Sequence, residues 1–228
     1  MKEKLLNGLK WFFNSFIWLG ILIFVIDIIT KNIVVQNAES IANAGGQNGG
    51  VDIIPGLLGI NYVINKNVVF GWDVFKNETT NRIVFIVIAL LISAIIIFFL
   101  IKKWGKINRF YKACLMLIVA GAIGNAIDRI FYTVEYLNYV DPSTGKYITG
   151  VVDWIDFYGI WHFNFNIADS AIVVAAIMLI IYMIVVEIIE YRRKAKLESK
   201  KEVDNTKVIS KTEQEKNAYL EDKKNKDE

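Results

Sequence analysis

Acidic and amide side chains lie at the ends of two long apolar stretches of this chain, where they could form a reactive site. One group contains Asn125, Asp128 and Arg129, and the other contains Asn166 and Asp169. An Asp at the centre of a membrane-spanning helix costs roughly 2.5–3.5 kcal/mol on insertion scales, so such residues usually face a partner or a water-filled cavity. Two polar groups of this kind can share one cavity, which makes them a candidate functional site.

Three aspartates are candidates for a pair of catalytic carboxylates. Asp169 begins the last apolar stretch, and Asp153 and Asp156 precede it in a short aromatic and β-branched segment. Two neighbouring carboxylates cannot both ionise easily, so they share one proton. The ionised member can activate water while the protonated member polarises a carbonyl group, which hydrolyses an amide without a nucleophilic side chain. Spacing alone leaves open which two aspartates form the pair.

A second polar pattern lies within the third apolar stretch. Gly121, Asn125, Asp128 and Arg129 are separated by three or four residues or are adjacent, so they lie on one face of a helix. We expect Asp128 and Arg129 to form an ion pair that orients its neighbours. Taken alone, Gly121 and Asn125 would be a contact between packed helices.

Four apolar stretches must position these residues. The 228 residues are 54% hydrophobic, and their apolar blocks are too long for the alternating surface of a soluble domain. Each block reaches the length of about 20 residues that a bilayer core requires. The first block lacks a small-residue cleavage site directly after it, so we interpret it as a retained helix. The sequence predicts an all-α membrane protein with four transmembrane helices at residues 11–29, 83–101, 113–131 and 165–186.

Charge predicts how these helices are oriented in the membrane. Lysines and arginines precede the first span, fill the connection between the second and third, and follow the fourth. By contrast, residues 128–169 contain two basic and six acidic residues. The positive-inside rule therefore predicts cytoplasmic N and C termini and a site near the outer face.

The segments outside the spans divide into three parts. Residues 30–82 should form an outer platform, with a Gly-rich loop followed by short strands over 51–65. The turn sequence at 141–145 predicts a second outer hairpin or lid. Residues 190–228 are densely charged and should form a disordered cytoplasmic tail that starts as a continuation of the last helix. The membrane domain is thus expected to cover residues 1–189.

Cysteine and histidine each occur only once in the sequence, which limits disulfide, metal-binding and nucleophilic chemistry. Cys114 is the only cysteine, which excludes an intramolecular disulfide, and we interpret it as a small buried hydrophobe. His162 is the only histidine, which argues against a multi-histidine metal site. Its aromatic neighbours are typical of a membrane surface, which favours an interfacial role over catalysis. The chain carries no nucleic-acid signature.

Four segments in this order resemble the signal peptidase II family of membrane aspartyl proteases, the lipoprotein signal peptidases. They cover the chain up to about residue 187 and are Asp27-Ile-Ile-Thr30-Lys31, Asn65-Lys-Asn-Val-Val-Phe70, Gly124-Asn-Ala-Ile-Asp128-Arg129, and Val151-Val-Asp153 followed by Phe165-Asn166-Ile-Ala-Asp169.

The resemblance implies a role for each matching residue. It implies that Asp153 and Asp169 are the catalytic dyad. The residues that would bind or position the substrate or the dyad are Asn65, Asn125, Arg129 and Asn166. Those in supporting roles would be Asp27, Lys31, Gly124 and Asp128.

The resemblance also implies a reaction and a location. The chain would be a multi-pass protein of the bacterial plasma membrane that contacts lipids and removes signal peptides from diacylglyceryl-modified prolipoproteins, cutting before the lipidated cysteine. No metal or organic cofactor should be needed, because the dyad and water suffice, and a monomer is expected.

Two other functions remain open from the residues. A proton-coupled transporter or channel could use Asp27, Asp128 and Asp169 as a relay. A relay predicts acids at several membrane depths, whereas these acids lie near one boundary, which favours the protease. A non-enzymatic scaffold with acidic outer loops would tolerate Asp169→Asn, and a protease would not.

Overall fold

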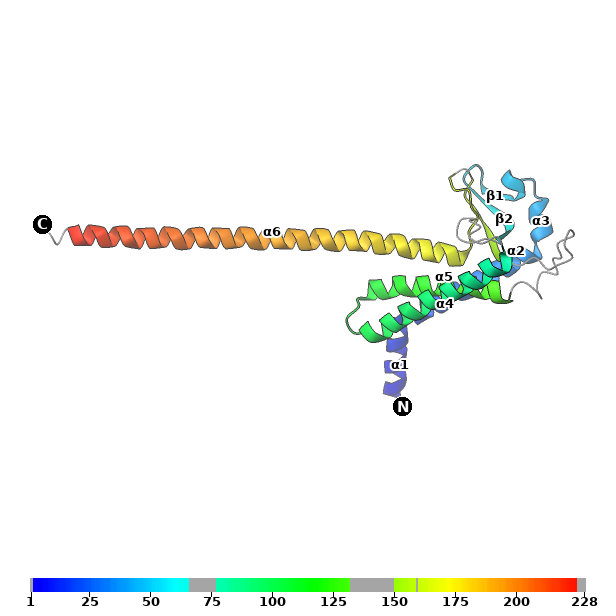
Figure 1. The fold of residues 1–228 in the computed structure, drawn as a ribbon, viewed down its shortest axis with the longest axis horizontal. Coiled ribbons are helices and arrows are strands. Elements are labelled where there is room, and N and C mark those ends of the chain that lie inside the picture. Colours follow the sequence, from blue (N-terminus) through cyan, green and yellow to red (C-terminus); the bar gives the residue numbers. More distant parts are fainter. Residues whose placement is uncertain (1, 66–76, 132–149, 159, 225–228) are drawn as a thin grey trace. The chain divides into compact units, whose positions relative to one another are not determined.

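The computed structural model describes residues 2–65, 77–131, 150–158 and 160–224. The predicted turn at 141–145 and the motif positions 66–70 lie outside these residues. Figure 1 shows the elements in chain order. The helices are α1 (Lys2–Ser15), α2 (Ile17–Gln36), α3 (Ala38–Ala42), the 3-10 helix η1 (Gln47–Gly49), α4 (Glu78–Lys103), α5 (Arg109–Phe131) and α6 (Ile167–Lys224). The strands are β1 (Val51–Ile54), β2 (Leu58–Asn65) and β3 (Val151–Asp156).

Four of these helices are long and apolar enough to cross a membrane. They are Ile17–Gln36, Thr79–Lys103, Arg109–Ile130 and Ile167–Lys200. Large apolar side chains on them are exposed, as suits surfaces that face lipid tails. The predicted class, an all-α membrane protein with four transmembrane helices and a small β-containing platform, is therefore confirmed.

The first predicted span has the wrong bounds. Phe16 adopts a left-handed conformation with φ 59°, which ends one helix at Ser15 and starts the next at Ile17. The Ser15 hydroxyl donates to the Phe12 carbonyl and accepts from the Ile17 N–H, so the buried break satisfies its polar groups. The helix that can span therefore runs from 17 to 36 rather than from 11 to 29, and α1 is a separate element.

The platform contains an antiparallel sheet in the order β1-β2-β3. Its first two strands occupy the segment 51–65 that the sequence predicts to form strands. The third strand comes from a segment that follows α4 and α5, and in the sheet Asn65 pairs with Val151 and Val63 pairs with Asp153. A small core of Val34, Ile41 and Val152 joins the sheet to α2 and α3. The platform is thus built from two segments rather than from residues 30–82 alone.

The chain divides into two compact units, residues 1–179 and 180–228. All of the site described below belongs to the first unit. In the second unit, α6 continues to Lys224, where the sequence predicts a frayed tail. Opposite charges four residues apart, such as Lys194 and Glu198, favour helix in a segment that has little apolar surface to bury. The cytoplasmic location of this segment stays a prediction.

Candidate active site

Strand pairing places the first of the expected catalytic aspartates. The register between β2 and β3 places Asn65 diagonally across from Asp153, two positions from its direct partner Val151, and Asn65 Nδ2 donates to Asp153 Oδ2 over 2.9 Å. Asp153 is only 2% exposed. This buried carboxylate has a fixed orientation, because the amide donor satisfies one of its two oxygens.

Helix capping fixes the second aspartate. Asn166 Oδ1 accepts from the Asp169 backbone N–H over 2.8 Å, and Asp169 Oδ2 accepts from the Asn166 backbone N–H over 3.4 Å. This reciprocal pair is a capping box at the start of α6, with Asn166 as the cap and Asp169 three positions later. Asp169 is therefore held at the positive end of the helix dipole, which favours its carboxylate.

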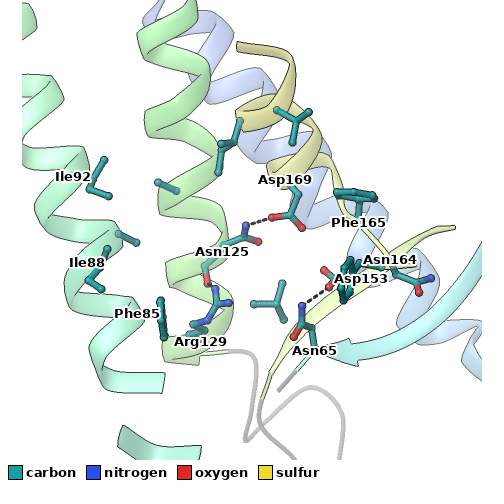
Figure 2. Close-up of a pocket in the computed structure, with 16 residues that line it drawn as sticks. Asn65, Phe85, Ile88, Ile92, Asn125, Arg129, Asp153, Asn164, Phe165 and Asp169 are labelled. Atoms are coloured by element: carbon teal, nitrogen blue, oxygen red, sulfur yellow. Dashed lines mark hydrogen bonds between the residues drawn. The ribbon is translucent and has the colours of Figure 1, made fainter. Parts of the chain in front are cut away.

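Two asparagines connect the carboxylates. Asn166 Nδ2 donates to Asp153 Oδ1 over 2.8 Å, and Asn125 Nδ2 donates to Asp169 Oδ1 over 2.6 Å. Asn166 Nδ2 also lies 3.2 Å from Asn125 Oδ1, so the two amides contact each other. Asp153 and Asp169 line the same pocket, and Figure 2 shows Asn65 bonded to Asp153 and Asn125 bonded to Asp169. The structure thus brings together five residues from four separate segments of the sequence.

The environment of Asp153 changes its acidity. Burial, together with the negative charge of Asp169, raises the pKa of this carboxyl to about 7, against the lowering effect of the Asn65 hydrogen bond. A carboxyl with this pKa exchanges its proton near neutral pH, which suits a general acid or base.

The dyad opens into a cavity of about 310 Å³. Its polar end contains Asn65, Asn125, Arg129 and the two aspartates. Arg129 Nη1 donates to the Asn125 carbonyl over 3.1 Å, which holds the guanidinium along this end. Apolar side chains from α4, α5 and α6 form the other walls and include Phe85, Ile88, Ile92, Ala122, Ile172 and Val173 (Figure 2). The contribution of α4 was not predicted, because a uniformly apolar span gives no sign of which face lines a cavity.

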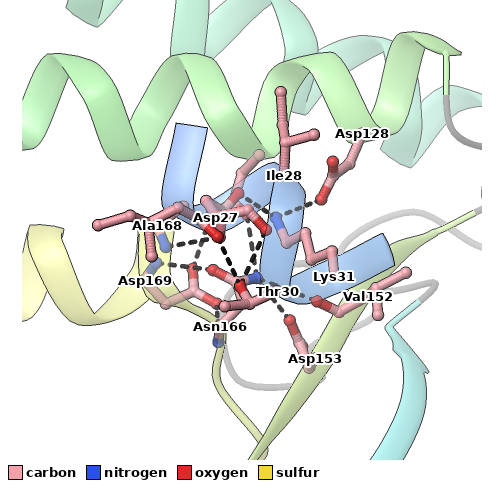
Figure 3. A network of polar contacts seen from close by, with 12 residues as sticks. Asp27, Ile28, Thr30, Lys31, Asp128, Val152, Asp153, Asn166, Ala168 and Asp169 are labelled. Carbon is pink, nitrogen blue, oxygen red and sulfur yellow. Dashed lines mark hydrogen bonds and ion pairs between the residues drawn. The ribbon is translucent and has the colours of Figure 1, made fainter. Parts of the chain in front are cut away.

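A buried ion cluster lies behind the dyad. Lys31 Nζ donates to Asp27 Oδ2 over 2.6 Å and to Asp128 Oδ2, and all three side chains are almost completely buried. Asp27 Oδ1 accepts from the Ala168 backbone N–H over 2.9 Å, one residue before Asp169 (Figure 3). The cluster thereby joins α2, α5 and the first turn of α6.

The expected ion pair between Asp128 and Arg129 is wrong. Asp128 forms its ion pair with Lys31, while Arg129 bonds to the Asn125 carbonyl and lines the cavity. Adjacent side chains on a helix point about 100° apart, so neighbours in sequence rarely face the same partner.

Two glycines allow α5 to approach its neighbours closely. A Cβ atom at Gly121 would overlap the Ala168 carbonyl oxygen, and one at Gly124 would lie 3.2 Å from Asp27 Oδ2. Gly121 thus supports the contact with the first turn of α6, and Gly124 supports the contact with the ion cluster.

We expect Gly121→Ala to lower peptidase activity by roughly 10- to 100-fold, because displacement of catalytic groups by about 1 Å has effects of this size. The added methyl group would push the start of α6, with Asp169, away from Asn125. The measurement is kcat/KM in detergent. Gly105→Ala is the control, since a Cβ atom there meets no atom within 4 Å. Equal activity of both variants would show that α6 tolerates the displacement.

The other residues considered from the sequence, Asp156, His162 and Cys114, do not line the cavity. Asp156 accepts from Asn48 Nδ2 over 2.9 Å and is not among the residues that line the cavity. His162 is exposed in the loop before α6, and Cys114 is fully buried in α5.

Known proteins resemble this chain over the same elements. A profile of the family described as signal peptidase (SPase) II matches residues 19–185, more than half of the chain. A lipoprotein signal peptidase of Actinobacillus succinogenes is 32% identical over 183 residues, which cover 79% of this chain and 92% of that protein. One from Clostridioides difficile is 30% identical over 172 residues, which cover 75% and 96%.

A solved structure supports the same relation. It is described as a bacterial membrane enzyme determined by the in meso method at 2.3 Å resolution. It has a TM-score of 0.52 and 28% identity, and the match covers 75% of this chain and 90% of that chain. The matching profile spans α2, the sheet, α4, α5 and the apolar part of α6, which together build the cavity. The chain belongs to the signal peptidase II family.

Proposed function

We propose that this protein is an aspartic endopeptidase of the membrane that removes the signal peptide from diacylglyceryl-modified prolipoproteins, cutting before the lipidated cysteine. The observation that carries this proposal is the pair Asp153 and Asp169, held by three asparagine amides at the polar end of an apolar cavity. The family membership supports the removal of signal peptides, and the geometry supports the aspartic mechanism.

In the proposed reaction, the dyad holds one proton at the start. Asp169 lies at the positive end of the α6 helix dipole, which favours its ionised form, so Asp153 carries the proton and donates a hydrogen bond to the scissile carbonyl. The Asp169 carboxylate takes a proton from water, whose oxygen attacks the carbonyl carbon. The tetrahedral intermediate collapses when the departing amine takes a proton from the dyad, which returns to one proton.

The asparagines act as positioning residues in this scheme. The Asn166 and Asn65 amides donate to both oxygens of Asp153, and Asn125 donates to Asp169. Amide donors stabilise a carboxylate without offering it a proton, so the shared proton stays between the two aspartates. Arg129 supplies a positive charge at the same end of the cavity, where it can bind a peptide carbonyl or balance the dyad.

The cavity fits the proposed substrate class. Its apolar walls on α4, α5 and α6 can hold acyl chains or an apolar signal-peptide segment, while the scissile bond reaches the polar end. The excess of acids between residues 128 and 169 and of lysines and arginines at the opposite helix ends supports a site near the outer face, with both termini in the cytoplasm.

The deciding experiment compares two substrates with the purified full-length protein in detergent. A diacylglyceryl-modified prolipoprotein should release its signal peptide, whereas the same polypeptide without the lipid should be cut at least about 10-fold more slowly, because a lost apolar ligand group removes several kcal/mol of binding. Mass spectrometry of the products locates the cut. Failure to cleave the lipidated substrate would overturn the proposal.

The acidity of the dyad predicts a pH dependence. Below both apparent pKa values of the pair, two protons occupy the dyad, and above both the shared proton is lost. With the pKa of Asp153 at about 7, we expect kcat/KM to fall on the alkaline side with an apparent pKa near 7 and to fall again in acid. The profile is measured with a substrate that lacks groups titrating in this range. A flat profile would contradict the shared-proton mechanism.

The raised pKa of Asp153 also makes the stability of the fold depend on pH. The direction is opposite to that of a salt-bridged Asp, whose pKa is lowered. Because the pKa of Asp153 is raised from 3.8 to about 7, the folded state holds this proton where the unfolded state has lost it. The contribution of Asp153 to stability is therefore present below about pH 4 and is lost as the pH rises through 7.

The transporter alternative has no comparable support. Its relay would use Asp27, Asp128 and Asp169, but Asp27 and Asp128 are bonded to Lys31 in a closed cluster with almost no exposed side-chain surface. A carboxylate neutralised by a buried lysine is a poor proton carrier, because protonation would leave the lysine charge unpaired.

A further inference from the structure

The helix α1 is amphipathic and separate from the first span. Leu5, Leu9 and Phe13 are four residues apart, and Leu6 lies beside them, so these four side chains share one face. Their exposed fractions are 67%, 47%, 57% and 53%, respectively. The opposite side of the helix carries Asn7 and other polar residues. The described part of the protein therefore leaves the apolar face of α1 uncovered.

The other side of α1 is attached to the connection between α4 and α5. The rings of Trp11 and Trp104 stack with their centroids 6.0 Å apart. Lys112 Nζ lies 4.3 Å from the centroid of Trp104, and Arg109 lies over the ring of Phe16 at 5.8 Å. The Trp11–Trp104 stack and the contact of Arg109 with Phe16 hold the end of α1 on the bundle, and Lys112 holds Trp104 in place. Figure 1 shows α1 directed away from α2, as expected from the left-handed Phe16 between them.

Positive charge is concentrated at this end of the bundle. The α4–α5 connection with the adjoining helix ends, residues 102–112, contains five basic residues and no acidic one. Within α1, Lys4 and Lys10 flank the apolar face and are exposed, with Glu3 as the only acid. The exposed cations of α1 and the connection are Lys4, Lys10, Lys102, Lys103, Lys106 and Arg109.

We propose that α1 and the α4–α5 connection form a binding surface for an anionic phospholipid leaflet. The apolar face of α1 lies in the boundary between headgroups and acyl chains, parallel to the membrane, and the lysines and Arg109 contact lipid phosphates. An uncovered apolar face bordered by lysines is the pattern of an interfacial helix, and tryptophans favour this depth. The partner is the lipid because the charges complement phosphate and the helix joins a transmembrane span directly.

The first test measures the depth of α1 in single-copy nanodiscs, which exclude cover by a second copy. The full-length protein carries a nitroxide label at Leu9→Cys or, as the matched control, at Asn7→Cys, each with Cys114→Ala. We expect the ratio of accessibility to oxygen over accessibility to a nickel chelate to be roughly 10-fold higher at position 9, since interfacial helices bury their apolar face by about 5–10 Å. Equal ratios at both positions would overturn the proposal.

The second test addresses charge. Native mass spectrometry measures the ratio of bound phosphatidylglycerol to bound phosphatidylcholine. We expect Lys4→Gln and Lys10→Gln each to lower this ratio about fivefold, because a lysine near an anionic surface contributes about 1 kcal/mol. Lys200→Gln in α6 is the control. An unchanged lipid preference, or protection of position 9 from both oxygen and the chelate, would contradict the lipid surface and indicate a protein cover instead.

Discussion

Asp153→Asn and Asp169→Asn should each lower kcat/KM for a lipidated prolipoprotein by roughly 10³- to 10⁴-fold, at the upper end of the effects of general acids and bases. Asparagine has nearly the shape of aspartate but can neither accept the proton from water nor carry the shared proton. The effect should therefore appear in kcat more than in KM, since the substrate still fits the cavity. Cleavage is followed by release of the signal peptide under single-turnover conditions.

The hydrogen bonds predict how each variant affects folding. Both oxygens of Asp153 accept from amides, at 2.8 and 2.9 Å, so an asparagine there points its own NH₂ group at one of them. Asp153→Asn should therefore lower the melting temperature, because one buried donor faces another. Asp169→Asn can keep its carbonyl toward Asn125, so its NH₂ group faces only the long contact from the Asn166 backbone N–H at 3.4 Å, and the melting temperature should change less.

Asp156→Asn is the matched control for both. Asp156 lies on the same strand as Asp153, is also buried, and accepts from Asn48 Nδ2 outside the cavity. We expect its activity to stay within about threefold of the wild type, since Asp156 does not line the cavity and an asparagine there can still accept from Asn48 Nδ2 through its carbonyl oxygen. Inactive Asp156→Asn together with active Asp153→Asn would mean that the dyad has been assigned to the wrong residue.

The sequence predicts the elements of this fold better than their contacts. The span around residues 83–101 carries no charge, so its helix follows from length and hydropathy alone. Residues 51–65 contain β-branched residues and turn formers and form the expected strands β1 and β2. The kink at Phe16 could not be predicted, because an aromatic residue has no preference for the left-handed conformation that it adopts there.

In the candidate site, too, local contacts follow from the sequence and contacts between distant segments do not. Asn166 and Asp169 are three residues apart, so their mutual capping follows from local sequence. Asn65 and Asp153, by contrast, meet only because β3 pairs with β2 in one register, and a shift of one residue would turn Asp153 to the other face. Lys31 is similar: its partner Asp27 is one turn away, but its bond to Asp128 depends on the packing of α2 against α5.

Lys31→Met should destabilise the protein by about 3–5 kcal/mol, because removing one partner of a buried ion cluster leaves uncompensated charges. Here two carboxylates, Asp27 and Asp128, would remain with almost no exposed surface. Asp128 is especially vulnerable, since its Oδ1 already lacks a hydrogen-bond partner among the described residues. We expect a fall in melting temperature of roughly 10 °C in detergent. Lys103→Met, which alters an exposed lysine at the end of α4, should change it little.

A combined variant separates stability from catalysis. Lys31→Met with Asp27→Asn and Asp128→Asn removes all three charges, and neutral replacements of a buried cluster are often tolerated or even stabilising. The asparagine that replaces Asp27 could still accept from the Ala168 N–H through its carbonyl oxygen, which keeps the first turn of α6 in place. We therefore expect the triple variant to regain most of the lost melting temperature. If it also regains activity, the cluster acts by positioning α6. Recovered stability without recovered activity would mean instead that the charges themselves act on the proton shared by Asp153 and Asp169.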